Sequence, residues 1–289
     1  MNKPLFTGVC TALVTPFLDG KINYPMMEIL LRRQMEAGVK SLVIAGTTGE
    51  APALSDDEKL ELFRRCKEYV GMQCKIIAGT GSNNTEHAVW LSKEAEKCGV
   101  DALLVVSPYY NKANEEGLTA HYLSIAHAVK IPVIIYNVPS RTGVDIPVSV
   151  YKTLSHVPNI AGVKEASTSL SKVLQIRAEC PELPVWSGND DLIVPVMSLG
   201  GCGVISVLSN VAPVETLALT NSALAADYAT ASALQRQLFP LTKLLFCDVN
   251  PIPVKAAMQC IGYDCGGCRL PLTSLTKENT EKLRSYFEA

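Results

Sequence analysis

The segment CGVDALLVVSP at Cys98–Pro108 shows the pattern from which much of the chain is built: the end of an amphipathic stretch, a Gly-Val step, and a short apolar run. The same order recurs as AGVKSLVIAGT at Ala37–Thr47, IAGVKEAS at Ile160–Ser167 and GCGVISVLSN at Gly201–Asn210. Short apolar runs without alternation are typical of parallel strands that are covered on both faces. The repetition therefore predicts an α/β protein made of strand–helix units.

Eight such strands are expected, separated by segments long enough to hold helices. One helix is predicted to begin after Ser55, which forms a capping-box pattern with Glu58. Eight strand–helix units fit a closed (β/α)8 TIM barrel better than an open sheet, which usually has fewer strands. The strands are predicted to begin near Val9, Leu42, Lys75, Ala102, Val133, Ile160, Val185 and Val204.

The end of the chain differs from the repeated part because it has no strand-like run. We expect residues 1–225 to form the barrel that carries the active site and residues 226–289 to form a C-terminal helical appendage. Helices are predicted in the appendage around Asp227–Phe246, Pro253–Ile261 and Lys277–Phe287.

Composition excludes several classes of partner. The formal net charge is −2, and no cluster of Lys and Arg appears, so neither a nucleic acid nor an anionic membrane surface is an expected partner. The uncharged stretch Leu192–Val214 is as long as a membrane span. Pro195 and Gly200, among other breakers, would interrupt such a helix, so we expect a soluble protein.

The cysteines indicate a reducing compartment. Ten cysteines are scattered along the chain, and Met1–Cys10 has no signal-peptide pattern, so the sequence predicts a cytoplasmic protein. Cys265 and Cys268 form a single C-x-x-C without a second pair or a companion histidine. We interpret them as ordinary thiols rather than as a metal or redox site.

Catalytic residues of such a barrel lie at the carboxyl ends of the strands. Lys164 directly follows the apolar run IAGV, so its amine is expected to project from a largely apolar barrel wall toward the barrel mouth. Burial disfavours the charged form of an amine and so favours the neutral nucleophile. The alternative is that Lys164 only forms an ion pair with Glu165 at the rim.

A lysine that forms a Schiff base also needs groups that move protons. Tyr136, Thr47 and Tyr110 follow strands and offer a chain of hydroxyls, although such tyrosines are often packing residues. The histidines are poor candidates because all four are predicted in helices. These are His87, His121, His127 and His156.

Two further features suit carboxylate groups. The turn Gly46–Glu50 offers free amides and the hydroxyls of Thr47 and Thr48. Arg141 is placed to bind a second carboxylate. The alternatives are that the turn is a plain connection and that Arg141 makes a rim ion pair.

Several motifs together resemble the 4-hydroxy-tetrahydrodipicolinate synthase (dihydrodipicolinate synthase) family of pyruvate-dependent Schiff-base lyases and aldolases. The resemblance runs nearly from end to end, and the motifs occur in the family's order. They are GTTGE at Gly46–Glu50, SPYYNK at Ser107–Lys112, YNVPSRTG at Tyr136–Gly143, GVKEAS at Gly162–Ser167 and GCGVISV at Gly201–Val207.

The resemblance implies an activity in diaminopimelate and lysine biosynthesis. Pyruvate would form a Schiff base and then condense with L-aspartate 4-semialdehyde, with no metal or organic cofactor. A homotetramer built as a dimer of dimers is implied, although dimers also occur in the family. The implied catalytic residues are Lys164, Tyr136, Thr47 and Tyr110, the last reaching in from a neighbouring subunit. The implied substrate-binding residues are Thr48, Arg141, Gly188 and Ile205.

The main rivals share the barrel and the lysine: N-acetylneuraminate lyase and the keto-deoxy sugar acid aldolases. Those relatives typically lack the Ser-Arg-Thr that surrounds Arg141, because their second substrate is a sugar-like aldehyde. A barrel that only binds ligands is a further alternative, which the presence of both Lys164 and Tyr136 disfavours.

The resemblance also bears on regulation. Members inhibited by L-lysine tend to have histidines at the positions of Asp56 and Lys59 and a glutamate at that of His87. Tyr109 and Asn83 match the remaining part of that site. We predict weak or absent inhibition, because Lys59 brings a like charge toward an incoming amine and the acid is lost.

Overall fold

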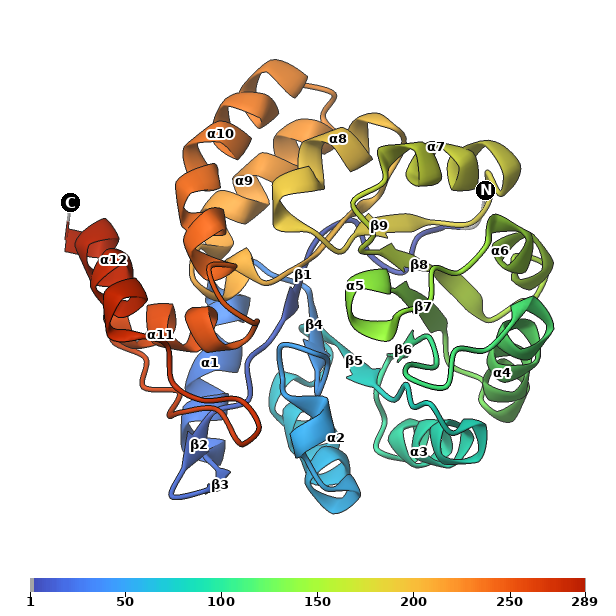
Figure 1. Ribbon diagram of the computed structural model, residues 1–289, viewed down its shortest axis with the longest axis horizontal. Helices are drawn as coiled ribbons and strands as arrows, with labels where there is room; N and C mark the ends of the chain where they lie inside the picture. Colours follow the sequence, from blue (N-terminus) through green and yellow to red (C-terminus); the bar gives the residue numbers. More distant parts are fainter. Residues whose placement is uncertain (1–2, 289) are drawn as a thin grey trace.

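The computed structural model describes residues 3–288 and has the predicted fold, a closed barrel of eight parallel strands surrounded by helices (Figure 1). Each strand begins within one residue of its predicted start. Around the barrel the neighbours are β1, β10, β9, β8, β7, β6, β5 and β4. The strands are β1 (Gly8–Ala12), β4 (Ser41–Ile44), β5 (Lys75–Gly79), β6 (Ala102–Val106), β7 (Val133–Asn137), β8 (Ile160–Glu165), β9 (Val185–Ser187) and β10 (Gly203–Ser206).

Helices connect consecutive strands and cover the outside of the barrel. The predicted capping box is confirmed, since the Glu58 amide donates to Ser55 Oγ at 3.2 Å and the Ser55 amide donates to Glu58 Oε2 at 2.9 Å. The helices are α1 (Tyr24–Glu36), α2 (Asp56–Val70), α3 (Thr85–Lys97), α4 (Glu115–Ala128), α5 (Pro139–Thr142), α6 (Val148–Leu154), α7 (Leu170–Glu179), α8 (Ile193–Ser198) and α9 (Pro213–Leu224).

Short elements complete the loops. The hairpin of β2 (Phe17–Leu18) and β3 (Lys21–Ile22) was not anticipated from the sequence, because its strands are too short to leave a pattern. Three 3-10 turns, η1, η2 and η3, lie in the loops after β4, β9 and β10. They span Ala51–Ala53, Asp190–Leu192 and Leu208–Asn210.

The C-terminal region is helical, as predicted, and lies on one side of the barrel next to α1 and α9 (Figure 1). It consists of α10 (Tyr228–Leu245), α11 (Ile252–Cys260) and α12 (Lys277–Glu288). The long α10 packs against α8 and α9, so the appendage extends the helical layer. The boundary near residue 225 stays a prediction.

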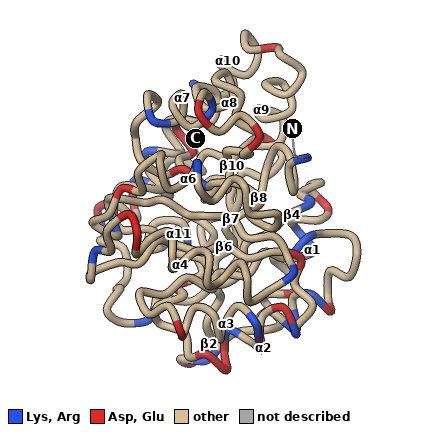
Figure 2. The backbone as a smooth tube through the Cα atoms, turned by 90° about the vertical axis from the view of Figure 1, so that its right-hand side faces the viewer, with Lys and Arg blue, Asp and Glu red and all other residues tan. Residues whose placement is uncertain are grey.

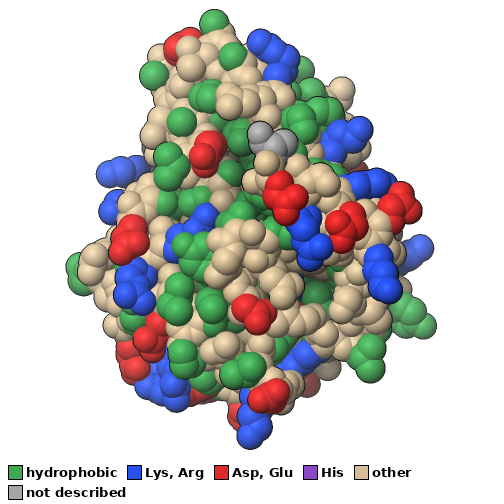
Figure 3. All heavy atoms as spheres, turned by 90° about the vertical axis from the view of Figure 1, so that its left-hand side faces the viewer, with side chains coloured by type: hydrophobic (Ala, Val, Ile, Leu, Met, Phe, Trp, Pro, Cys, Tyr) green, Lys and Arg blue, Asp and Glu red, His purple; other side chains and the backbone are tan. Residues whose placement is uncertain are grey.

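The uncharged stretch at 192–214 divides into α8, β10 and η3, as its prolines and glycines indicated. None of the helices within residues 3–288 is long and apolar enough to cross a membrane. Basic and acidic residues lie interspersed on the two opposite faces shown in Figure 2 and Figure 3.

Successive side chains along each strand point alternately outward and into the barrel, and this alternation produces two apolar cores. One lies between the strands and the helices, and the smaller one fills the barrel. At its base the Trp186 ring stacks on Phe6, with the ring centroids 4.7 Å apart. Gly162, at φ +147°, makes room for the indole, since a Cβ there would lie 2.6 Å from its Cζ3 atom. An apolar floor therefore lies toward the amino-end side of the barrel interior.

Candidate active site

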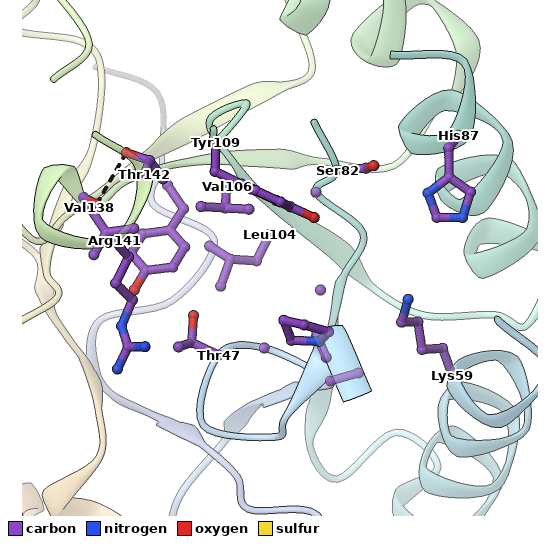
Figure 4. A pocket seen from close by; sticks show the side chains of 17 residues that line it. Thr47, Lys59, Ser82, His87, Leu104, Val106, Tyr109, Val138, Arg141 and Thr142 are labelled. Carbon is purple, nitrogen blue, oxygen red and sulfur yellow. Dashed lines mark hydrogen bonds between the residues drawn. The ribbon is translucent and has the colours of Figure 1, made fainter. Parts of the chain in front are cut away.

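A cavity of about 260 Å³ opens at the carboxyl end of the barrel, where the sequence placed the chemistry (Figure 4). Its lining comes from the ends of β5, β6 and β7 and from the segments that follow β4, β5, β6 and β7. Three of the predicted site residues line it directly: Thr47, Tyr136 and Arg141. In the view of Figure 4, Thr47 and Arg141 lie at one side of the cavity, and Lys59 and His87 lie at the other.

Lys164 is the buried amine of the site. It lies on β8 with only 5% of its surface exposed, and its Nζ atom is 4.2 Å from the centroid of the Tyr136 ring. The two residues are Cα partners across β7 and β8, which places both side chains inside the barrel. The ion pair with Glu165 is not formed, because Glu165 points to the other face of the strand and bonds to Asn137 and Ser167 there.

The turn after β4 is held from the C-terminal region. Thr48 is buried, and its Oγ1 accepts a hydrogen bond of 3.0 Å from Asn250 Nδ2. Arg141, exposed on α5, donates from Nη2 to the Asn250 carbonyl oxygen at 3.1 Å. Asn250 therefore joins the two segments that the sequence assigned to carboxylate binding.

A buried ion pair fixes the end of the same turn. Glu50 has a left-handed backbone, at φ +59°, and is 2% exposed. Its Oε1 atom is 2.7 Å from Lys255 Nζ, and its Oε2 atom accepts from the Arg269 amide at 2.8 Å. Lys255 lies on α11 and Arg269 follows it, so the C-terminal region determines the path of the Thr47–Thr48 turn.

Sequence reasoning missed Asn250, Lys255 and Arg269 because it assigned no site residue to the appendage. No local motif relates these residues to a turn about 200 positions earlier. Only the packing of the C-terminal region against the barrel mouth brings them together.

Gly188 and Ile205 lie in the wall of the barrel. Ile205 is fully buried on β10 and belongs to the interior core. A Cβ at Gly188 would lie 2.5 Å from the Cβ of Ala166, so only glycine permits the close approach of the segments after β8 and β9. These two residues and Thr48, like Lys164, are not among the residues that line the open cavity, and their role in binding stays a prediction.

Tyr110 is not brought into the site of its own chain. Its side chain is 89% exposed, and its backbone has φ +73°, a conformation that residues with a side chain rarely adopt. A hydroxyl chain from Tyr136 through Thr47 to Tyr110 is therefore not assembled within one subunit. The role that the resemblance implied for Tyr110 across an interface stays a prediction.

Asp190 is a buried acid that sequence reasoning missed. It follows Gly188 in the segment after β9, and its Oδ2 accepts from the amides of Val207 and Leu208, both at 2.9 Å. Burial raises the pKa of Asp190, and hydrogen bonds from Ser206, Leu208 and Val207 oppose that rise, with a smaller contribution from the charge of Lys164. Asp190 thus holds the turn directly after Ile205.

The histidines lie in helices with one exception. His87 is on α3, and His121 and His127 are on α4, as predicted. His156 is the exception, because α6 ends at Leu154 and His156 lies in the turn that follows. The prediction of a helix at His156 was wrong because α6 is too short to include it.

The cavity reaches α2 and α3 at its far side. Lys59 and His87 line it there, and both contact Asp56: Lys59 Nζ is 3.3 Å from Oδ1, and His87 Nε2 is 2.9 Å from Oδ2. These contacts lower the pKa of Asp56 against the opposing effect of burial. Lys59 therefore places a cation at this end of the cavity.

The Cys265–Cys268 segment is part of the C-terminal packing. Burial raises the pKa of Cys265 to about 12 and that of Cys268 to about 11, so neither thiol is activated. Both cysteines are free. Within residues 3–288, no group of three or more His, Cys, Asp or Glu side chains is arranged to hold a metal ion.

The fold and the buried lysine beside a tyrosine define a TIM-barrel enzyme of the Schiff-base-forming lyase class. The family model described as the dihydrodipicolinate synthetase family matches residues 5–289. The chain belongs to this family.

Similar proteins agree with this membership. The chain is 46% identical to the 4-hydroxy-tetrahydrodipicolinate synthase of Caldicellulosiruptor saccharolyticus, over 97% of this chain and 96% of that protein. It is 45% identical to the enzyme of the same name from Acetivibrio thermocellus, over 100% of this chain and 98% of that protein.

A solved structure of a similar protein has the same overall fold. The chloride-inhibited dihydrodipicolinate synthase from Acinetobacter baumannii, solved in complex with pyruvate, superposes with a TM-score of 0.96 at 40% identity and covers 98% of each chain.

Proposed function

We propose that the protein condenses pyruvate with L-aspartate 4-semialdehyde to give 4-hydroxy-tetrahydrodipicolinate, a step of diaminopimelate and lysine biosynthesis. The observation that carries this proposal is the Lys164 amine, 5% exposed and 4.2 Å from the Tyr136 ring centroid, at the carboxyl end of a barrel of this family. A buried amine beside a phenol has the chemistry that imine formation requires.

The first half of the reaction forms a nucleophile on the enzyme. The neutral Lys164 amine adds to the ketone carbon of pyruvate, and loss of one water gives an iminium. Loss of a proton from the former methyl group converts the iminium into an enamine. We assign these proton transfers to Tyr136, with Thr47 beside it in the cavity lining. Thr48 and the wall at Gly188 and Ile205 would hold the pyruvate.

The second half forms the carbon–carbon bond and the ring. The enamine carbon attacks the aldehyde carbon of the semialdehyde, and the aldehyde oxygen takes a proton. The amine of the semialdehyde then adds to the imine carbon and displaces Lys164, which closes the ring. One water is released overall. Arg141 lines the cavity with an exposed side chain, and its guanidinium would bind the semialdehyde carboxylate there.

Trapping with borohydride tests the covalent step. Pyruvate followed by borohydride should leave a reduced pyruvate adduct on Lys164, detected by peptide mass spectrometry, and Lys164→Ala should leave none. Lys59→Met is the matched control, because Lys59 lines the cavity next to Lys164 and Tyr136 and should not be required for the adduct. An adduct on any lysine other than Lys164 would contradict the assignment.

A substrate comparison tests the second partner. Pyruvate is supplied with either L-aspartate 4-semialdehyde or N-acetylmannosamine, and disappearance of pyruvate is measured. We expect turnover only with the semialdehyde. Turnover with only the sugar would instead support an N-acetylneuraminate lyase.

The same proposal includes a homotetramer in the cytoplasm, with Tyr110 donated to a neighbouring subunit. Its 89% exposure and its positive φ support a side chain built for a contact outside its own chain. Light scattering measures the assembly. Mixing Tyr110→Phe subunits with Lys164→Ala subunits should restore part of the activity, because some sites then combine an intact lysine with an intact tyrosine. A lack of restoration in proven mixed assemblies would contradict the exchange.

A further inference from the structure

A second hydrogen-bonded pair lies directly behind the reactive pair, on the outer face of the same two strands. Asn137 follows Tyr136 on β7, Glu165 follows Lys164 on β8, and the two are Cα partners. Both are almost completely buried. Asn137 Nδ2 donates to Glu165 Oε1 at 2.9 Å and to Oε2 at 3.1 Å.

Glu165 is the last residue of β8 and accepts further hydrogen bonds there. Its Oε1 accepts from the Ser167 amide at 2.8 Å, and its Oε2 accepts from the Tyr151 hydroxyl at 3.5 Å. Burial raises the pKa of Glu165, while the hydrogen bonds from Ser167 and Asn137 oppose that rise. These contacts connect β8, β7 and α6 at the level of the reactive lysine.

Asn137 extends the network to the loop that carries Arg141. Its Oδ1 accepts from the Ile146 amide at 3.1 Å, and its Nδ2 also donates to Asp145 Oδ1 at 2.8 Å. Lys172 on α7 contacts Asp145 and donates to the Ile146 carbonyl oxygen at 2.6 Å. The loop is therefore held where it leaves β7 and again where it returns.

We propose that Asn137 and Glu165 are positioning residues for the condensation, a role that rests on the proposed function. Side chains alternate between the two faces of a strand. A hydrogen-bonded pair on the outer face therefore fixes the backbone from which the neighbouring inner side chains project. The Asn137–Glu165 pair holds the Lys164 amine against Tyr136, and the Asn137–Asp145 contact holds the Arg141 loop over the cavity.

The two contacts affect different steps. Strain between β7 and β8 would shift the amine relative to the phenol and would slow imine formation. A loosened loop would leave imine formation intact and would weaken binding of the second substrate. A residue that only stabilises the fold would change neither step selectively.

Glu165→Gln tests the first contact. The volume is kept, but an amide has one acceptor oxygen, so in either orientation its NH2 faces the donor Asn137 Nδ2, and in one orientation it also faces the Ser167 amide. The rate of Lys164 adduct formation at saturating pyruvate should fall about tenfold or more, since small misplacements of reacting groups are costly. Rapid borohydride quenching measures this rate, and the KM for pyruvate should change less.

Asp145→Ala tests the second contact at a half-exposed position, where folding should persist. The KM for the semialdehyde should rise about threefold to tenfold, because the loop loses the hydrogen bond from Asn137 and the contact with Lys172. The rate of adduct formation should be unchanged. If Glu165→Gln fails to fold, Asp145→Ala alone tests the proposal. An unchanged KM for the semialdehyde in Asp145→Ala would then overturn it.

Asp101→Asn is the matched control, because Asp101 ties strands at the opposite end of the barrel. Its Oδ2 accepts from the Ile76 amide at 2.8 Å and lies 2.8 Å from Lys67 Nζ. We expect a lower melting temperature and unchanged kinetics. Equal rate losses in Asp101→Asn and Glu165→Gln would show a merely structural role. A wild-type enzyme that forms no adduct on Lys164 would contradict the proposed function itself.

Discussion

The two ends of the barrel are formed by the same strands but differ in the polarity of their side chains. At the amino end, Phe6 stacks on Trp186, and the indole Nε1 donates to the Phe6 carbonyl oxygen at 3.2 Å. At the carboxyl end, hydroxyls and a guanidinium line a cavity of about 260 Å³, and the buried Lys164 amine lies against the ring of Tyr136, which belongs to that lining. The apolar end is closed by packing, whereas the polar end stays open and is held in place by residues outside it.

This contrast shows how stability and reactivity are separated along one set of strands. The apolar end gains free energy from burial and needs no exact placement of polar groups. The polar end contains buried charges that are costly unless they are paired. It therefore depends on the Glu50–Lys255 pair and on Asn250, which come from the C-terminal region.

The largest effect on stability is expected from breaking the buried pair at the polar end. Lys255→Met leaves the Glu50 carboxylate buried without its cation and should destabilise the protein by roughly 3 to 5 kcal/mol. Because the pair holds the turn of Thr47 and Thr48, activity should also fall in the molecules that remain folded. Denaturant unfolding and adduct formation measure the two effects. A variant as stable as the wild type would contradict the dependence on this pair.

Phe6→Ala should destabilise the apolar end by about 3 kcal/mol, because it removes a ring that stacks on Trp186. The rate of Lys164 adduct formation below the melting transition should be unchanged. Urea unfolding and borohydride trapping on one preparation compare the two quantities. A loss of adduct formation in the folded variant would mean that the two ends are coupled.

Arg141→Ala should act on chemistry with little effect on stability, because the side chain is exposed. Loss of a charge-assisted contact to the semialdehyde should lower kcat/KM by an amount equivalent to about 2 to 3 kcal/mol. Formation of the pyruvate adduct should persist. An equal loss of both steps would show that the arginine is structural.

His121 should make stability depend on pH, although it lies outside the site. It is 3% exposed on α4, and burial lowers its pKa to about 4. The unfolded chain binds a proton that the native site excludes, so stability is lost as the pH falls from about 6.5 toward 4. The loss at pH 5 relative to pH 7.5 should be about 2 kcal/mol.

Urea unfolding at the two pH values measures this dependence, and His121→Gln should reduce it. His127→Gln is the control, because His127 lies on the same helix but is exposed. If both variants keep the wild-type dependence, another group is responsible.

The smallest effect is expected from L-lysine. Lys59, beside Asp56 and His87, already places a cation at the far side of the cavity. A second ammonium group would be repelled there, so inhibition should be weak or absent. Inhibition of the purified enzyme at submillimolar L-lysine would contradict this prediction.

The barrel and the place of its chemistry could be predicted because they depend on local patterns. The apolar runs marked strand starts to within one residue, and the Ser55–Glu58 box marked the start of α2. Lys164 could be recognised because it ends such a run. The β2–β3 hairpin and the end of α6 before His156 were missed, since both depend on a few residues without periodicity.

The amino-acid sequence alone determined the strand–helix repeat, the polar residues after each strand and the family motifs, because these are properties of neighbouring positions. Tertiary structure alone decided which face of β8 carries the amine, which turn Asn250 and Lys255 support, and that Tyr110 points away from its own site. The physical reason is that these relations join distant parts of the chain through burial and hydrogen-bond geometry, for which no local pattern exists.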